Sequence, residues 1–261
     1  MSTKIYVCTS IKGGVRKTTD TVELGLGLAH TGRRVLIIDT DHQCNSTLAI
    51  TDQMTERKEG TFFEVMMERK PVKEVIQQTK FPHLDLVEGS MWLSNANSKL
   101  ASEYGRETIL RHALEGISGY HYILIDTAPN TELITVNAWV ASTGLIINLT
   151  PSKWAMVGIR ILEIHLKEIQ RQTKRNYPIF GVIVGKYEHT NLHKDRLEQI
   201  QNYFGDKVFK AVIPKNIKVE EATDNAIPIY DYAPDSTGAQ AYADLVQEFI
   251  QRSESEETHH A

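Results

Sequence analysis

Cysteine is scarce in this chain of 261 residues, which contains only Cys8 and Cys44 and no CxxC pair. Two isolated cysteines provide neither a disulfide framework nor the spacing of a metal site, so the composition fits a reducing compartment. Long apolar runs are absent too: no stretch approaches the ~20 residues that span a bilayer, and residues 1–10 lack the pattern of an export signal. We therefore expect a cytoplasmic protein with no stable membrane association.

The chain has no large excess of positive or negative charge, and its formal net charge is −4. No overall basic field attracts the chain to nucleic acid, so any DNA binding must come from a local patch. The sequence also lacks internal repeats and Gly/Ser/Pro-rich linkers. We expect one domain over residues 1–251, followed by a polar, acidic tail at 252–261 that is predicted to be disordered.

Short apolar runs rich in β-branched residues alternate with helical patterns along the chain. The expected strands cover residues 5–9, 35–38, 84–87, 122–125, 145–149, 179–184 and 208–213. The clearest helical patterns cover residues 19–30, 107–116, 157–172, 194–204 and 239–250. Because these strands are apolar on both faces, the alternation predicts an α/β fold, a single-domain doubly wound, mostly parallel sheet with helices on both faces.

A glycine-rich segment, Lys-Gly-Gly-Val-Arg-Lys-Thr-Thr, joins the first expected strand to the first long helix. Such a turn directs backbone N–H groups and the positive end of the helix dipole at phosphate oxygens. In this placement Lys17 would reach the β and γ phosphates of a nucleotide, and the Thr18 hydroxyl would ligate Mg²⁺. The loop residues expected to bind nucleotide are Lys12, Gly13, Gly14, Val15, Arg16, Lys17, Thr18 and Thr19.

The loop departs from the ordinary Walker A motif, because Arg16 occupies the glycine position before Lys17. It fits the deviant pattern K-G-G-x-x-K-[ST] and so resembles the ParA/MinD group of P-loop ATPases. The resemblance implies that the additional lysine, Lys12, crosses a dimer interface to the phosphates of the partner's ATP. A glycine permits positive φ and close backbone approach, so a bulky Arg16 is expected to slow catalysis or weaken binding.

Two expected strands end in acidic residues. After residue 38 the sequence Asp-Thr-Asp-His-Gln-Cys-Asn-Ser-Thr resembles the family's D-x-D-P-Q-G-N-x-T segment, with His42 replacing proline. By that match, Asp41 orients the attacking water and Asp39 supports the Mg²⁺ shell, since positioning dominates phosphoryl transfer. Strand 122–125 ends in Asp126, which resembles the family's Walker B aspartate and would hold a Mg²⁺-bound water. Lys12, Lys17 and Asp41 are thus the predicted catalytic residues.

The resemblance covers nearly the whole chain. Residues 212–222, Val-Ile-Pro-Lys-Asn-Ile-Lys-Val-Glu-Glu-Ala, are similar to the family's V-I-P-R-N-V-R-L-S-E-A segment. This match implies that Pro214 and Asn216 belong to the loop that contacts adenine. The first expected strand begins almost at once, which resembles the compact, chromosomal-type form without an N-terminal helix-turn-helix.

The family's properties imply an ATPase that forms a homodimer with ATP and takes part in DNA partition or cargo positioning. The dimer would bind non-specific DNA, placing it on the nucleoid, and a ParB-like or adaptor protein would stimulate otherwise slow hydrolysis. We expect Lys186, Lys215 and Lys218 to contact DNA. Lys218 matches one family DNA-contact position, whereas His189 stands where arginine is usual.

Three alternatives remain on the sequence alone. A MinD-like membrane-cycling ATPase requires a basic amphipathic C-terminal segment, whereas residues 247–261 are polar and mostly acidic. A nitrogenase-reductase-like iron–sulfur protein requires cluster cysteines late in the chain, and none follows Cys44. A nucleotide-binding scaffold with impaired hydrolysis is suggested by Arg16 and His42.

Overall fold

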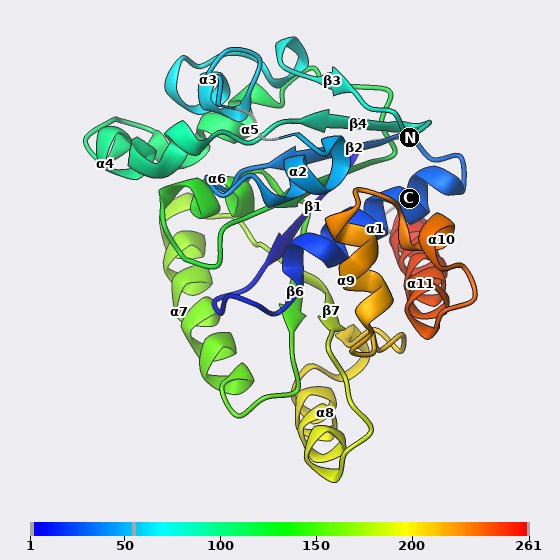
Figure 1. Ribbon diagram of the computed structural model, residues 1–261. Coiled ribbons are helices and arrows are strands. Elements are labelled where there is room, and N and C mark those ends of the chain that lie inside the picture. The colour runs from blue at the N-terminus through cyan, green and yellow to red at the C-terminus, as the bar shows by residue number, and fades with distance from the viewer. Residues whose placement is uncertain (1–2, 54–55, 260–261) are drawn as a thin grey trace.

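The computed structural model describes residues 3–53 and 56–259. Its centre is a seven-stranded sheet in the order β3-β4-β2-β5-β1-β6-β7 (Figure 1). Neighbouring strands are parallel except for β3, which pairs antiparallel with β4. The strands are β1 (Lys4–Thr9), β2 (Val35–Asp39), β3 (Gln77–Gln78), β4 (Leu84–Val87), β5 (Tyr122–Asp126), β6 (Gly144–Leu149) and β7 (Ile179–Val184).

Helices fill the connections between the strands. They are α1 (Lys17–His30), α2 (Asn45–Thr51), α3 (Phe62–Met67), α4 (Ala96–Leu100), α5 (Ile109–Ala113), α6 (Leu133–Ala141), α7 (Ala155–Thr173), α8 (Asn191–Phe204), α9 (Ile217–Asp224), α10 (Ile229–Tyr232) and α11 (Thr237–His259). Short 3-10 helices lie at η1 (Val72–Glu74), η2 (Met91–Asn95), η3 (Arg106–Thr108) and η4 (Gly205–Lys207).

The sheet separates two hydrophobic cores, one beneath each layer of helices. Along β1, Val7 packs into the core under α6 and α7, while Tyr6 and Cys8 pack into the core under α1 and α11. Figure 1 shows these two helical layers on either side of the strands. Alternate side chains of a strand point to opposite faces, so both faces of β1 are apolar and covered. The predicted doubly wound α/β fold is confirmed.

One predicted strand is wrong. Val208 forms an isolated bridge with Val182 of β7, and Pro214, directly after the segment, forms another with Tyr187 beyond the end of β7. Between them, the backbone N–H groups of Lys210 and Ala211 donate to the Glu248 carboxylate of α11, at 2.8 and 3.2 Å. Because a side chain takes these donors, a regular ladder with β7 does not form. The other six predicted strands are present, with end positions within one residue of the expected ones.

The last helix continues past residue 251, where the sequence predicts the start of a disordered tail. The Arg252 guanidinium donates to the carbonyl oxygens of Lys207 and Val208, at 3.0 and 2.8 Å. Ser253 is fully buried, and its hydroxyl lies 2.8 Å from that of Tyr122. These contacts explain why α11 extends through the first residues of the predicted tail, whose last two residues lie outside the described part. No described helix combines the length and apolarity needed to cross a membrane.

Candidate functional site

The carboxyl ends of three adjacent strands meet at one edge of the sheet. In the parallel register, Asp126 of β5 lies opposite Cys8 of β1 on one side and Asp39 of β2 on the other. The glycine-rich loop leaves β1 at this same edge and enters α1. Ligands of open α/β sheets bind outside the carboxyl ends of the strands, so the fold brings the predicted loop and the two acidic strand ends to one place.

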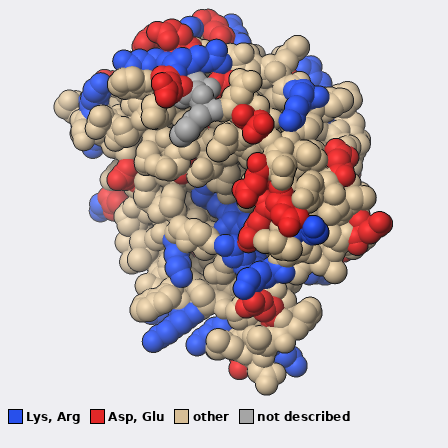
Figure 2. Space-filling model, viewed as in Figure 1, with Lys and Arg blue, Asp and Glu red and all other residues tan. Residues whose placement is uncertain are grey.

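A hollow of about 220 Å³ lies at this edge, lined by residues 12–19 together with Ser10, Asp41, Asn45 and Pro129. Figure 2 shows basic side chains gathered in a depression in the middle of the face where α1 begins. The basic residues that line the hollow are Lys12, Arg16 and Lys17. α1 has no side-chain cap at its N-terminus, so its first N–H groups remain available to an anion in the hollow.

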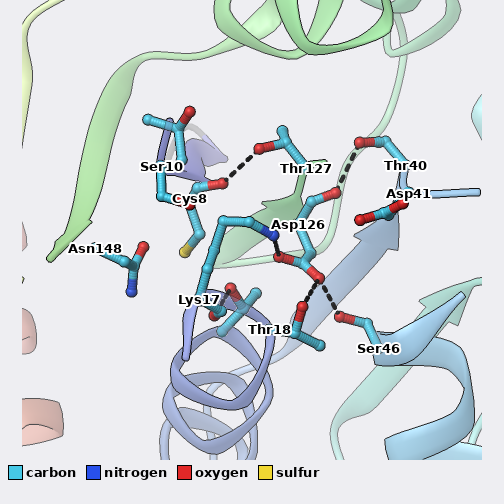
Figure 3. A network of polar contacts seen from close by, with 12 residues as sticks. Cys8, Ser10, Lys17, Thr18, Thr40, Asp41, Ser46, Asp126, Thr127 and Asn148 are labelled. Atoms are coloured by element: carbon cyan, nitrogen blue, oxygen red, sulfur yellow. Dashed lines mark hydrogen bonds and ion pairs between the residues drawn. The ribbon is translucent and has the colours of Figure 1, made fainter. Parts of the chain in front are cut away.

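Lys17, Thr18 and Ser46 converge on the carboxylate of Asp126 (Figure 3). The Lys17 ammonium lies 2.6 Å from Oδ1, and the hydroxyls of Thr18 and Ser46 each donate to Oδ2 at 2.8 Å. Lys17 and Asp126 are both buried. Sequence reasoning missed Ser46, because its place at Asp126 depends on how the loop after β2 turns.

That turn passes through Cys44, which adopts the left-handed backbone conformation (φ 53°) immediately before α2. The family's pattern has a glycine at this position, and glycine adopts such a conformation without strain. Ser46, the second residue of α2, thereby faces Asp126. The glycine in the pattern is the signal from which the turn could have been expected.

Asp39 is fully buried, and its hydrogen bonds go to the loop that follows β2. Oδ2 accepts from the backbone N–H and the hydroxyl of Thr47, at 2.9 and 2.8 Å, and Oδ1 accepts from the backbone N–H of Asp41 at 3.1 Å. Burial and the nearby charge of Asp126 raise the pKa of Asp39 to about 7, although the bonds from Thr47 lower it. These contacts tie Asp39 to the loop that carries Asp41 and Ser46, and its place in the Mg²⁺ shell stays a prediction.

Asp41 lines the hollow with its carboxylate, which Figure 3 shows beside Asp126. Its Oδ1 atom accepts from the backbone N–H of Gln43 at 3.0 Å and lies 3.5 Å from Nδ1 of His42. Both contacts use the same oxygen. The side chain is therefore held in place at the wall of the hollow, as positioning a water molecule requires.

Lys12 and the two glycines are exposed at the rim of the hollow, whereas Val15 and Arg16 are buried. The Arg16 guanidinium donates to the carbonyl oxygens of Pro214 and Asn216, at 3.1 and 3.3 Å. The structure thus brings the segment predicted to contact adenine against the phosphate loop, although 198 residues separate Arg16 from Pro214.

None of the predicted DNA-contacting lysines lines the hollow. A parallel bridge between Tyr187 and Pro214 brings the segment that carries Lys186 alongside the one that carries Lys215, and Lys218 lies in the first turn of α9. Lys215 pairs with Glu188 at 2.9 Å, and Lys218 pairs with Glu221 at 2.8 Å. Both pairs are exposed, so a polyanion must compete with a carboxylate for each of these cations.

The donor set of the hollow fits a nucleoside triphosphate with Mg²⁺. A buried ammonium and the free N–H groups of a helix N-terminus suit phosphate oxygens. The hydroxyls of Thr18 and Ser46 and the carboxylate of Asp126 are hard oxygen ligands, which suit Mg²⁺ and its bound waters.

Comparison with known proteins agrees with this geometry. A protein-family model described as an AAA domain, AAA_31, matches residues 3–179. The chain is 35% identical over 247 residues to the sporulation initiation inhibitor protein Soj of Bacillus subtilis, covering 94% of this chain and 97% of Soj. It is 34% identical over 253 residues to the chromosome partitioning protein ParA of Caulobacter vibrioides, covering 95% and 94% respectively. A solved putative plasmid partition protein of Borrelia burgdorferi, bound to AMPPNP, has the same fold, with a TM-score of 0.81 and 22% identity over 96% of this chain and 100% of that one.

Proposed function

Because this chain belongs to the ParA family of partition ATPases, we propose that it is an ATP-switched dimer that positions DNA or another intracellular cargo. The observation that carries the proposal is the group formed by Lys17, Thr18 and Asp126 at the N-terminus of α1, with Asp41 on the wall of the same hollow. ATP and Mg²⁺ are the ligands of this site.

Each residue of the group has a distinct task in this proposal. Lys17 leaves Asp126 to neutralise the β and γ phosphates, and Thr18 ligates Mg²⁺. Asp126, with Ser46 beside it, holds water bound to Mg²⁺. Asp41 orients the attacking water at the γ phosphate, since phosphoryl transfer depends on positioning and charge stabilisation more than on a strong base.

Dimerisation is proposed from two features at the rim of the hollow. Lys12 is exposed there, so its ammonium is available to the nucleotide of a second copy. Beside it, α7 and its cap expose apolar side chains at helical spacing, namely Trp154, Val157, Ile161 and Ile164. Trp154 lines a hollow that also includes Lys12. Apolar surface next to a charged rim is typical of an interface between subunits.

DNA binding is proposed for Lys186, Lys215 and Lys218. One copy offers few clustered cations, and two of these lysines are paired with glutamates. A two-fold dimer doubles the set on one molecule and raises its avidity, so ATP becomes the switch for DNA. The ATP-bound dimer would then reside on the nucleoid.

Release from DNA is proposed to follow hydrolysis that is slow in the isolated protein. A ParB-like or adaptor protein would stimulate this step. We propose that this partner binds the ATP-bound dimer. The hydrolysis that it stimulates would then release the protein from DNA.

The test is the molecular mass in solution with no nucleotide, with ADP and Mg²⁺, and with a non-hydrolysable ATP analogue and Mg²⁺. We expect doubling of the mass only with the analogue. Lys12→Ala should bind nucleotide but remain a monomer, whereas Lys17→Ala should lose nucleotide binding. A mass that is the same in all three conditions would rule out the dimer.

DNA binding is tested separately with duplexes of unrelated sequence. We expect DNA binding with the ATP analogue. A plot of the logarithm of the binding constant against the logarithm of the salt concentration should have a slope of roughly −0.9 for each phosphate neutralised. Lys218→Glu should weaken binding to every duplex, while Lys174→Glu serves as the control, because Lys174 lies at the end of α7, away from the proposed patch. Equal affinity with ADP and with the analogue would exclude DNA as the matrix.

A further inference from the structure

Arg16 is the residue of the phosphate loop whose contacts the proposed function does not use. It is 7% exposed and adopts the left-handed conformation (φ 77°, ψ 17°) immediately before α1. This conformation costs an L-residue free energy that glycine does not incur. A buried arginine held in it must make interactions that offset the cost.

Those interactions begin with two backbone carbonyls. The Nη1 and Nη2 atoms of Arg16 donate to Pro214 and Asn216 at 3.1 and 3.3 Å, so one guanidinium holds the residues on both sides of Lys215. The segment is also fixed from its other side. The Asn216 side chain caps α9 by accepting from the backbone N–H of Lys218 at 2.8 Å, and it donates to Thr237 at 2.9 Å.

Two buried carboxyls on α1 lie within electrostatic range of Arg16. Asp20 and Glu23 follow Arg16 by four and seven residues, which places them on the same face of the helix. Both are almost completely buried. Burial raises the pKa of each, and the positive charge of Arg16 lowers it, so the cation favours their ionised forms.

These carboxyls are themselves tied to the surrounding elements. Asp20 accepts from the Tyr242 hydroxyl at 2.6 Å and from the Asn148 amide at 2.9 Å. Glu23 accepts from the backbone N–H of Ile229 at 3.2 Å. The two carboxyls thus contact β6, α10 and α11, while the Arg16 guanidinium itself contacts residues 214 and 216 at the start of α9.

We propose that Arg16 is a positioning residue that clamps residues 214–216 against the phosphate loop and thereby sets the affinity of the site for the nucleoside half of its ligand. The inference rests on the proposed function, in which phosphates bind at residues 12–18 and residues 214–216 border the base. A triphosphate without a nucleoside reaches only the loop, so its binding does not depend on the clamp. Lysine cannot replace Arg16, because the two carbonyls require the two N–H groups of a guanidinium fork.

The experiment compares the dissociation constants of ATP and inorganic tripolyphosphate, each with Mg²⁺, by calorimetry. The proteins are the wild type, Arg16→Lys and Arg16→Gly. For both variants we expect ATP affinity to fall by about 10-fold or more, as the loss of two charged hydrogen bonds implies. In Arg16→Lys, which keeps the positive charge at the hollow, tripolyphosphate affinity should change by less than about 3-fold, since that ligand reaches only the loop. Arg175→Lys, at an exposed position after α7, is the matched control and should bind both ligands as the wild type does.

The two variants separate positioning from folding. Glycine adopts the left-handed conformation without strain, and lysine keeps the charge opposite Asp20 and Glu23, so the two changes disturb the fold in different ways. Equal weakening of ATP and tripolyphosphate would overturn the inference, as would wild-type ATP affinity in Arg16→Lys. Failure of the wild-type protein itself to bind ATP would instead overturn the proposed function.

Discussion

The ammonium of Lys17 lies 2.6 Å from Oδ1 of Asp126 in the buried centre of the candidate site. The pair joins the first residue of α1 to the end of β5. On the proposed function, Lys17 would turn from this carboxylate to the phosphates of the nucleotide, and Asp126 would hold water bound to Mg²⁺. Without ligand, each charge balances the other.

Removing one partner of this pair should therefore destabilise the ligand-free protein. Asp126→Ala leaves the Lys17 ammonium buried without a counter-charge, and the free energy of unfolding should fall by about 3–5 kcal/mol. Urea unfolding measures the loss. The double variant Lys17→Ala, Asp126→Ala should lose less than the sum of the two single variants. Purely additive losses would contradict the coupling, and Glu168→Ala, which breaks an exposed ion pair on α7, should cost little.

Asp41→Ala should separate hydrolysis from binding. The change removes the carboxylate at the wall of the hollow but leaves the phosphate loop, Thr18 and Asp126 in place. We expect ATP affinity close to that of the wild type and hydrolysis slower by about 100-fold or more. Single-turnover assays measure the rate. Asp244→Ala is the matched control, because it removes an exposed aspartate of α11 that does not line the hollow, and its hydrolysis should match that of the wild type. Wild-type hydrolysis by Asp41→Ala would assign the positioning of the water to another residue.

Stability should fall with rising pH because of Glu23. Burial raises the pKa of this carboxyl from 4.5 to about 8, with hydrogen bonds from Ile229 and the charge of Arg16 opposing the shift. Below pH 4.5 the group is protonated in both the folded and the unfolded protein, so its contribution is fully present. Between about pH 4.5 and 8 only the unfolded form ionises, so the free energy of unfolding decreases with pH and levels off above 8.

Glu23→Gln tests this dependence, because the amide cannot ionise. Urea unfolding at pH 5, 7 and 9 should show a flatter profile for the variant than for the wild type. Each unit of pKa shift corresponds to about 1.4 kcal/mol, so the profiles should diverge by a few kcal/mol. Parallel profiles would show that another group carries the pH dependence. Asp20, whose burial raises its pKa to about 6, adds a smaller decrease at lower pH in both proteins.

The apolar row on α7 should control dimerisation. Ile164 is 66% exposed, and Ile164→Glu puts a carboxylate into the proposed contact between two copies. We expect the ATP-dependent dimer to weaken by about 10-fold or more, with nucleotide affinity unchanged. Sedimentation at several protein concentrations measures the dimer. Leu192→Glu changes an equally exposed apolar residue on α8 and should leave the dimer intact; equal effects of both changes would exclude a specific role for α7.

The fold could be predicted because its strands are marked by local patterns. Runs such as residues 35–38 and 179–184 are apolar over their full length and rich in β-branched residues, as is typical of buried parallel strands. The phosphate loop and Asp126 could be predicted because binding phosphate and Mg²⁺ requires particular residue types, and these residues directly follow strands that the sequence marks clearly. Residues 208–213 have the same apolar composition, yet Glu248 takes two of their N–H groups, and no local pattern contains that contact.

The rest of the site depends on partners that are distant in sequence or on loop conformation. Ser46 reaches Asp126 because Cys44 turns the chain through a left-handed conformation. The hydrogen bonds by which Asp39 holds Thr47 and the backbone of Asp41 also depend on the fold of this loop, and its predicted place in the Mg²⁺ shell stays a prediction. From the sequence, Arg16 was expected to slow catalysis or weaken binding, because it replaces a glycine in the phosphate loop. The hydrogen bonds that offset the strain of its backbone go to residues 214 and 216, and no spacing pattern in the sequence predicts contacts between such distant segments.

Both edges of the sheet are closed to further strands within the described part of the chain. One edge is the two-residue antiparallel strand β3. At the other edge, Phe209 and Ile213 donate to the carbonyls of Val182 and Val184, and Glu248 occupies the N–H groups between them. An edge without a long row of free backbone groups cannot template strand addition from another molecule, the route to irreversible aggregates. Copies gathered at high local density, as the proposed function requires, would therefore find no sheet edge in the described residues through which to pair.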